Sequence, residues 1–131
     1  MTQIPESHID LLDRPIVVML ATVMPDGGPQ VTPVWASRHG NQIWVNSAVG
    51  RQKDQNLRLR PMATIAVTEP DNPYRWLEVR GRVVEIEVGQ TAVDHIEALA
   101  QAYVGGPFNS ANPSEERVIY KIEPTHVNVG G

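Results

Sequence analysis

The sequence predicts a mainly β fold, a closed or nearly closed antiparallel barrel of six strands, formed by residues 1–131 as a single domain. Three observations carry this prediction. Six runs are rich in Val, Ile and other strand-forming residues, turn signals such as MPDGG and RHGN separate the early runs, and few segments show helical spacing. Strands joined by short turns, with few helices to cover a sheet, favour a barrel with flanking helices.

The first third of the chain contains a short helix and three strands. Residues 5–12 form the helix, and an apolar, β-branched strand at 16–23 stops at the turn MPDGG. Residues 29–37 give the second strand of a hairpin. Pro33 inside this strand indicates a sheet edge, a bulge or a missing ladder hydrogen bond. The turn RHGN then leads to a third strand at 42–47.

The middle of the chain predicts a basic helix followed by two strands. The helix begins near Gly50 or Arg51 and stops before Pro61, because a residue that precedes proline disfavours the helical conformation. A fourth strand covers 62–68, and EPDNPY at 69–74 is a loop.

The last part predicts a long strand, a helix and a final strand. The apolar phase of the fifth strand, residues 75–87, slips between Gly81 and Val84, which suggests a β-bulge there. The sixth strand spans 117–129. A helix at 90–106 ends at two glycines and carries an apolar stripe. The stripe consists of Val93, Ile96, Leu99, Ala100 and Tyr103.

Composition excludes several classes of function. The formal net charge is -4, which argues against broad nucleic-acid binding, and no apolar run approaches the roughly 20 residues of a membrane span. Without cysteine there is no disulfide or thiol nucleophile, and the N-terminus lacks the pattern of a secretory signal, so we expect a cytoplasmic protein. No metal site is predicted, because the histidines are scattered. These are His8, His39, His95 and His126.

One feature of this acidic chain stands out, a cluster of four cations within residues 51–60. Arg51 and Lys53 fall in the first turn of the predicted helix, where the macrodipole disfavours positive charge. A bound anion would resolve this, because free N–H groups at a helix start, the Ser47 hydroxyl and two cations together suit a phosphate. The alternative is that all four cations are simply solvated on a surface helix.

Arg58 and Arg60 lie in the last turn of the same helix, where cations are favoured. Solvation of the helix end explains them as well as ligand binding does. His95 lies beside the apolar stripe of the later helix, and we expect it to be a surface or packing residue.

Three segments, in this order and spacing, resemble the pyridoxamine-phosphate-oxidase-like superfamily of split β-barrels. They are DGGPQVTPVW, R-x-K-x-x-N-L-R-x-x-P and NPYRWLEVRGRVVE, and the resemblance runs from about Asp13 to Val129. The sequence looks most like the branch of small flavin or deazaflavin oxidoreductases that use coenzyme F-420. The resemblance therefore implies a six-stranded, FMN-binding type of split barrel.

The resemblance also implies a cofactor site. The phosphate would be held by Ser47, Arg51 and Lys53, with Asn56 on the same helix as support, and Asn46 belongs to the same site. A strand lies along the flavin or deazaflavin ring and offers it backbone groups. That strand contains Val31, Thr32, Pro33, Val34 and Trp35.

Family members are homodimers with a cofactor at each end of the interface. Tyr74 and Trp76 are therefore expected to reach the site from the partner subunit. The apolar strands can bury a second face only against another subunit, which also favours a dimer.

The expected function is hydride transfer from coenzyme F-420 to a small organic substrate, with the chemistry supplied mostly by the cofactor. No side chain is assigned as a catalytic acid. The nearest alternative is the same fold with FMN, since FMN also ends in a phosphate. Two further alternatives are a non-catalytic flavin- or deazaflavin-binding protein and an interaction module whose basic helix binds an acidic partner.

Overall fold

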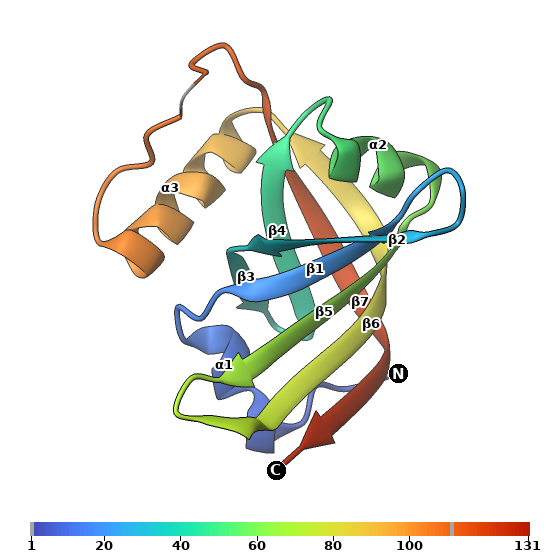
Figure 1. Cartoon of the computed structure of the whole chain (residues 1–131). Helices are drawn as coiled ribbons and strands as arrows, with labels where there is room; N and C mark the ends of the chain where they lie inside the picture. Colours follow the sequence, from blue (N-terminus) through green and yellow to red (C-terminus); the bar gives the residue numbers. More distant parts are fainter. Residues whose placement is uncertain (1, 111) are drawn as a thin grey trace.

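The computed structural model describes residues 2–110 and 112–131, and it confirms the mainly β, split-barrel prediction. One strongly curled sheet of seven strands has the order β2-β1-β5-β6-β7-β4-β3, and all neighbouring strands are antiparallel (Figure 1). The strands are β1 (Val18–Val23), β2 (Pro29–Val34), β3 (Ala36–His39), β4 (Gln42–Ala48), β5 (Met62–Glu69), β6 (Asn72–Val88) and β7 (Arg117–Gly130).

The sheet has seven strands rather than six because the predicted second strand is divided at Trp35. Its first part, β2, pairs with β1, and its second part, β3, pairs with β4. These two strands are the opposite edges of the sheet, so the chain passes from one edge to the other within a single residue. The position of Pro33 in an edge strand agrees with its missing N–H donor.

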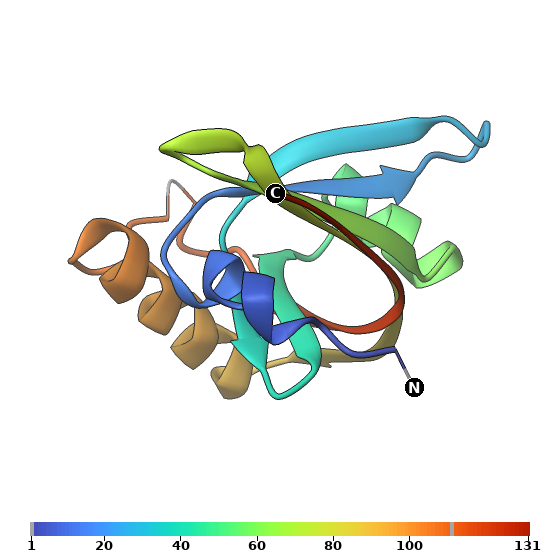
Figure 2. The same ribbon diagram turned by 90° about the horizontal axis from the view of Figure 1, so that it is seen from below.

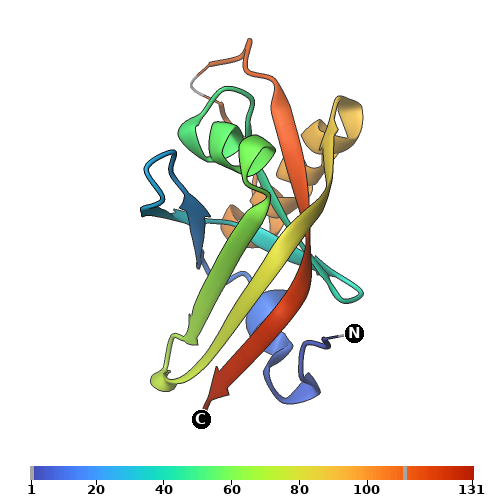
Figure 3. The ribbon, with the colours of Figure 1, turned by 90° about the vertical axis from the view of Figure 1, so that its right-hand side faces the viewer.

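The long strands β6 and β7 form the spine of the molecule and carry the predicted bulge (Figure 3). Their register shifts twice, between Arg80 and Gly81 and between Val83 and Glu85, which confirms the slip seen in the sequence. A Cβ atom on Gly81 would lie 2.6 Å from the backbone oxygen of Glu123, so glycine allows the two strands to approach closely here.

In the described part of the chain, three α-helices and one 3-10 helix surround the curled sheet. They are η1 (Glu6–His8), α1 (Asp10–Asp13), α2 (Gln52–Leu59) and α3 (Gln90–Val104). Viewed from below, η1 and α1 lie across the open end of the barrel (Figure 2). Ile4, Leu11 and Leu12 from this segment are buried in the same apolar core as the strands. Gly105, in the left-handed conformation, ends α3 as predicted.

Three local predictions differ from the structure. The predicted helix at 5–12 is divided into the 3-10 helix η1 and the α-helix α1. The predicted loop at 69–74 is a tight hairpin turn, because β5 continues to Glu69 and β6 already begins at Asn72. On α3, Val93 is exposed, and Ala92 and His95 are buried in its place. The contact face of α3 is thus rotated slightly from the stripe that hydrophobicity indicated. Within the described residues, no helix is both long and apolar enough to cross a membrane.

Candidate functional site

The short helix α2 is fixed to the barrel by one buried carboxylate. Asp54 accepts hydrogen bonds from the Gly50 N–H (2.9 Å), the Tyr120 hydroxyl (2.7 Å) and the Arg58 guanidinium (2.9 Å). Burial works to raise its pKa, but these hydrogen bonds together hold the pKa below the usual range. Asp54 therefore stays ionised and fixes the turn through which the chain enters the helix.

Asp54 does not pair with the two cations at the start of α2. Arg51 is the N-cap residue, and Lys53 lies in the first turn, half-buried. Within the described residues, the Lys53 amine has no hydrogen bond or ion pair to a side chain. Burial, followed by the nearby charges of Arg51 and Arg117, lowers the pKa of Lys53. Lys53 is thus a cation held beside other cations.

Arg117, the first residue of β7, is the third cation of this cluster. It is buried, its Nη1 atom donates to Glu115 Oε2 at 2.9 Å, and its guanidinium lies 4.9 Å from the centre of the Phe108 ring. Glu115 also accepts from Arg51. Glu115 therefore pairs with Arg51 and Arg117, and Lys53 adds a third positive charge near these two arginines. The local excess of positive charge suits an anion. We call Arg51, Lys53 and Arg117 the cation cluster.

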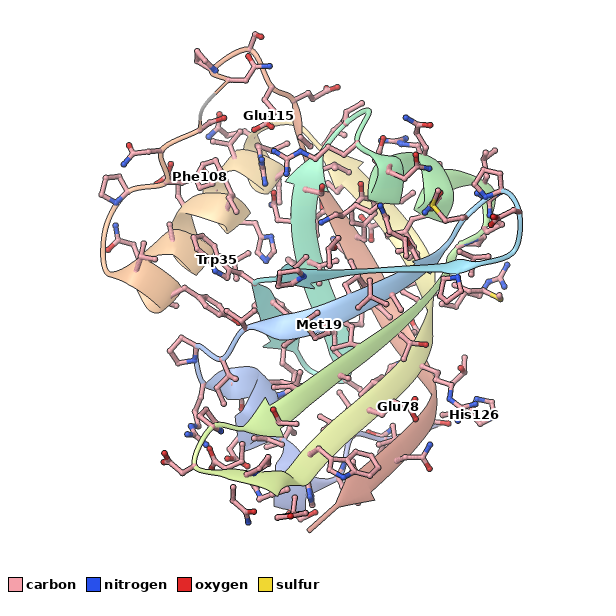
Figure 4. All side chains as sticks on the ribbon, viewed as in Figure 1. Met19, Trp35, Glu78, Phe108, Glu115 and His126 are labelled. Atoms are coloured by element: carbon pink, nitrogen blue, oxygen red, sulfur yellow. The ribbon has the colours of Figure 1, made fainter. Side chains whose placement is uncertain are left out.

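A cavity of about 400 Å³ opens beside the cation cluster. Figure 4 shows Trp35 and Phe108 on the same side of the barrel, with Glu115 above them. Most of the cavity wall is apolar, and its polar groups come from β4 and α2. The lining residues are Val17, Pro33, Val34, Trp35, Asn46, Arg51, Lys53, Ile96, Leu99 and Phe108.

Trp35 is held in place by Tyr103 of α3. The two rings stack with centroids 5.3 Å apart at an interplanar angle of 15°. The Tyr103 hydroxyl donates to the Ile16 backbone oxygen (2.9 Å) and accepts from the Ala36 N–H (3.1 Å). These hydrogen bonds fix the backbone where the chain passes from β2 to β3. Burial raises the pKa of the Tyr103 hydroxyl. The aromatic wall of the cavity is built into the fold rather than carried on a mobile tip.

The cavity thus brings together six of the residues predicted from the sequence. Ser47 is not among them. Alternation along β4 places Ser47 on the core side with Ile43 and Val45, whereas Asn46 faces the cavity. The Ser47 hydroxyl is buried without a hydrogen-bond partner. The expected phosphate-binding hydroxyl therefore does not line this cavity. The six residues are Pro33, Val34, Trp35, Asn46, Arg51 and Lys53.

Other residues of α2 are occupied inside the protein. Asn56 is fully buried and donates to Thr22 Oγ1 at 3.0 Å. It therefore joins the helix to β1 and supports the site without lining the cavity. Arg58 pairs with Asp54, and Arg60 donates to the Val23 backbone oxygen at 2.9 Å. These two arginines thus have partners inside the protein, rather than being simply solvated at the helix end.

The remaining predicted residues lie outside the cavity. Val31 is exposed and Thr32 half-buried on the edge strand β2. Tyr74, near the start of β6, is 81% exposed. The Trp76 indole lies against Gly130, where an added Cβ would come within 2.2 Å of it. Within one chain, Tyr74 and Trp76 do not line the cavity.

Sequence reasoning missed three contributors, Phe108, Glu115 and Arg117. Phe108 is the only phenylalanine in the sequence and lies in the Gly- and Pro-containing segment after α3. An aromatic residue in such a loop could have indicated a binding role, because loops often carry functional residues. Arg117 opens an ordinary strand, and no local pattern marks it. Only the pairing of β7 with β4 brings it beside α2.

Comparison with known proteins agrees with this architecture. Residues 4–129 match the family model described as pyridoxamine 5'-phosphate oxidase, and the chain belongs to this family. The family defines a class of split barrels with an oxidoreductase-like, flavin-binding character. No curated protein sequence matches the chain.

Among solved structures, an F-420 reductase is similar at 37% identity with a TM-score of 0.84, covering 95% of this chain and 98% of its own. A conserved hypothetical protein of Mycobacterium tuberculosis has 22% identity and a TM-score of 0.75, covering 99% and 89%. General Stress Protein 26 of Bacillus anthracis has 17% identity and a TM-score of 0.72, covering 95% and 92%. The last two show the fold alone.

Proposed function

We propose that the protein binds coenzyme F-420 and transfers a hydride from it to a small organic substrate. The observation that carries the proposal is Lys53, a half-buried amine beside Arg51 and Arg117 with no carboxylate of its own. An anionic phosphate would supply the missing counter-charge. The similarity to an F-420 reductase at 37% identity supports the deazaflavin as the group attached to that phosphate.

The residues of the cavity fit such a ligand. The cation cluster would hold the phosphate, and the aromatic and aliphatic wall around Trp35 would contact the flat ring and exclude water. Backbone groups of the edge strand β2, which pairs on one side only, are available to the ring's polar atoms. When bound, the deazaflavin supplies the hydride.

The same proposal includes a homodimer. Tyr74 and Trp76 can reach a cavity only from a second copy, since they do not line it within one chain. The outward faces of β1, β2 and β5 expose Met19, Val31 and Met62, which would be covered by the partner. A cytoplasmic location remains a prediction from the sequence.

FMN is the second candidate. A cluster of three cations with one paired carboxylate also suits the doubly charged phosphate monoester with which FMN ends. Non-catalytic binding of either cofactor uses the same site.

Titration of the purified protein with F-420 and with FMN, followed by fluorescence, tests the choice. We expect F-420 to bind more tightly. Equal affinities, or FMN that stays bound at full occupancy while F-420 fails to compete, would contradict the proposal. Reduced F-420 mixed with candidate acceptors then separates catalysis from binding, because only an enzyme makes its reoxidation by the acceptor faster with the protein than without it.

A further inference from the structure

A chain of hydrogen bonds joins the cation cluster to a buried histidine on α3. Arg117 Nε donates to Asn46 Oδ1 at 3.0 Å. A guanidinium has only donors, so this contact fixes which end of the Asn46 amide faces Arg117. The Asn46 amide nitrogen then points to the Ala92 backbone oxygen (2.9 Å) and to His95 Nδ1 (3.1 Å).

This arrangement determines the protonation of His95. Asn46 Nδ2 carries two hydrogens. The Ala92 oxygen accepts one, and the other is directed at His95 Nδ1, which must therefore be an acceptor. The neutral ring then carries its hydrogen on Nε2 and donates to Ser37 Oγ at 2.8 Å. The Ser37 hydroxyl is left free to donate to His39 Nε2, also at 2.8 Å.

We propose that His95 is a positioning residue of the anion site: its neutral imidazole holds Asn46, and through Asn46 the Arg117 guanidinium, in the orientation that binds an anion. This inference rests on the proposed anion-binding role of the cation cluster. If His95 Nδ1 were protonated, its N–H would face the N–H of Asn46 Nδ2, and two donors cannot form a hydrogen bond. Asn46 would then lose this contact. His95 touches no ligand in this proposal and acts only through Asn46.

The surroundings of His95 favour the neutral form. The ring centroids of His95 and of His39, on β3, are 6.1 Å apart in an edge-on arrangement. Lys121 on β7 adds a positive charge nearby. Burial first, then these two groups, lowers the pKa of His95 to about 4. On its other side, His95 borders a cavity of about 220 Å³ that it shares with charged residues. These are Asp13, Arg14 and Arg38.

Two substitutions at His95 separate positioning from packing. His95→Asn keeps an acceptor close to the place of Nδ1, whereas His95→Leu fills similar space without one. Sulfate is the probe, because it tests the cation cluster without any deazaflavin. We expect His95→Leu to weaken sulfate binding about three- to tenfold, as for the loss of one hydrogen bond. We expect His95→Asn to stay within about twofold of wild type.

His126→Asn, at an exposed histidine of β7, is the matched control and is expected to bind as wild type does. Thermal melts confirm that each variant is folded under the conditions used. If His95→Leu binds sulfate as well as His95→Asn does, the residue only packs and the inference is wrong.

A pH series gives a result that packing alone would not produce. Sulfate remains a dianion from about pH 7 down to about pH 4, so its own charge does not change. If electrostatics alone acted, protonation of His95 would strengthen anion binding as the pH falls. Positioning predicts the opposite, a fall in wild-type affinity relative to His95→Asn. A constant or rising ratio of wild-type to variant affinity overturns the inference.

F-420 titration of the same proteins distinguishes this inference from the proposed cofactor. Wild type that binds sulfate with the predicted dependence on His95 but does not bind F-420 supports the positioning role and contradicts the cofactor assignment. Wild type that binds no sulfate contradicts the positioning role directly.

Discussion

At the scale of single residues, the cations of α2 separate into two kinds. Arg58 and Arg60 have partners inside the protein, in Asp54 and the Val23 carbonyl. Lys53 lies in the first turn with positive neighbours. The position of each cation along the helix therefore decides its role. Arg58 lies against a carboxylate, whereas Lys53 lies beside the cavity.

Lys53→Ala tests the role of that second cation. A charge-assisted contact to phosphate contributes roughly 1.5–3 kcal/mol, so the affinity for F-420 should fall about ten- to a hundredfold. The free energy of unfolding should hardly change, since the amine has no carboxylate partner to lose. A cofactor titration and a thermal melt on the same variant measure both quantities.

Arg58→Ala is the matched control on the same helix. It removes a partner of the buried Asp54, so it should lower the melting temperature and leave the intrinsic cofactor affinity of the folded protein nearly unchanged. Unchanged affinity in Lys53→Ala would remove Lys53 from the site. A collapsed melting temperature in that variant would show that the amine is structural.

His95 gives a stability prediction with a definite sign. Its pKa is lowered from 6.5 to about 4, so the unfolded chain binds the proton more tightly than the folded protein. Stability should therefore be complete above pH 6.5 and decline as the pH falls toward 4. The loss is at most about 3 kcal/mol. Urea unfolding at the two ends of this range measures it.

In His95→Asn the same pH change should cost less stability, because the titrating group is gone. The His126→Asn control removes an exposed histidine and should keep the wild-type dependence. If wild type and His95→Asn decline in parallel, other groups govern the acid sensitivity. His39, whose pKa burial also lowers, is the first to examine.

At the scale of elements, the join between β6 and β7 is the most constrained. Gly81 lies at a register shift, and an added Cβ would come within 2.6 Å of both the Glu123 backbone oxygen and the Ile122 Cγ2 methyl group. Gly81→Ala should lower the free energy of unfolding by roughly 1–3 kcal/mol, because the added methyl group must push the two strands apart. Urea denaturation measures the difference.

Gly106→Ala provides the comparison, since its added Cβ would meet no atom within 4 Å. Its effect should stay within about 0.5 kcal/mol. Equal effects of the two substitutions would show that the close approach at Gly81 relaxes without cost. A large effect would show that the close approach of β6 and β7 at the bulge requires glycine.

At the scale of the whole molecule, the exposed face of the first hairpin predicts a dimer. Met19 on β1 is exposed, and its partners across the sheet are Pro33 and Ala66, so apolar side chains lie side by side on this face. A stable dimer interface buries on the order of 2,000 Å² in total. Light scattering at micromolar concentration should therefore show twice the mass of one chain.

Met19→Glu should convert the protein to a folded monomer, because a carboxylate would be buried without a partner at the interface. Val104→Glu, on the exposed end of α3, is the control and should leave the dimer intact. A wild-type monomer, or a dimer that persists in Met19→Glu, would rule out this face. If Tyr74 and Trp76 act across the interface, the monomeric variant should also bind F-420 more weakly.

Much of this fold followed from local sequence pattern. Short-range preferences decide the bounds of α2 and α3, five of the strands and the slip near Gly81. Turn residues and hydrophobic spacing indicate these preferences in the sequence itself. The cations at the start of α2 were also predictable, because a helix start is a local feature. Arg51 and Lys53 line the cavity, and their role in binding a phosphate stays a prediction.

Tertiary structure alone decided how these pieces meet. Nothing in the sequence near Trp35 shows that β2 and β3 belong to opposite edges of the sheet, since that depends on pairing with strands elsewhere in the chain. The same pairing brings Arg117 and Glu115 beside α2. His95 resembled a packing residue in the sequence, and only the folded chain shows its imidazole joined through Asn46 to Arg117. Local pattern fixes which residues form helices and strands, but hydrogen bonds between distant strands determine which side chains share a site.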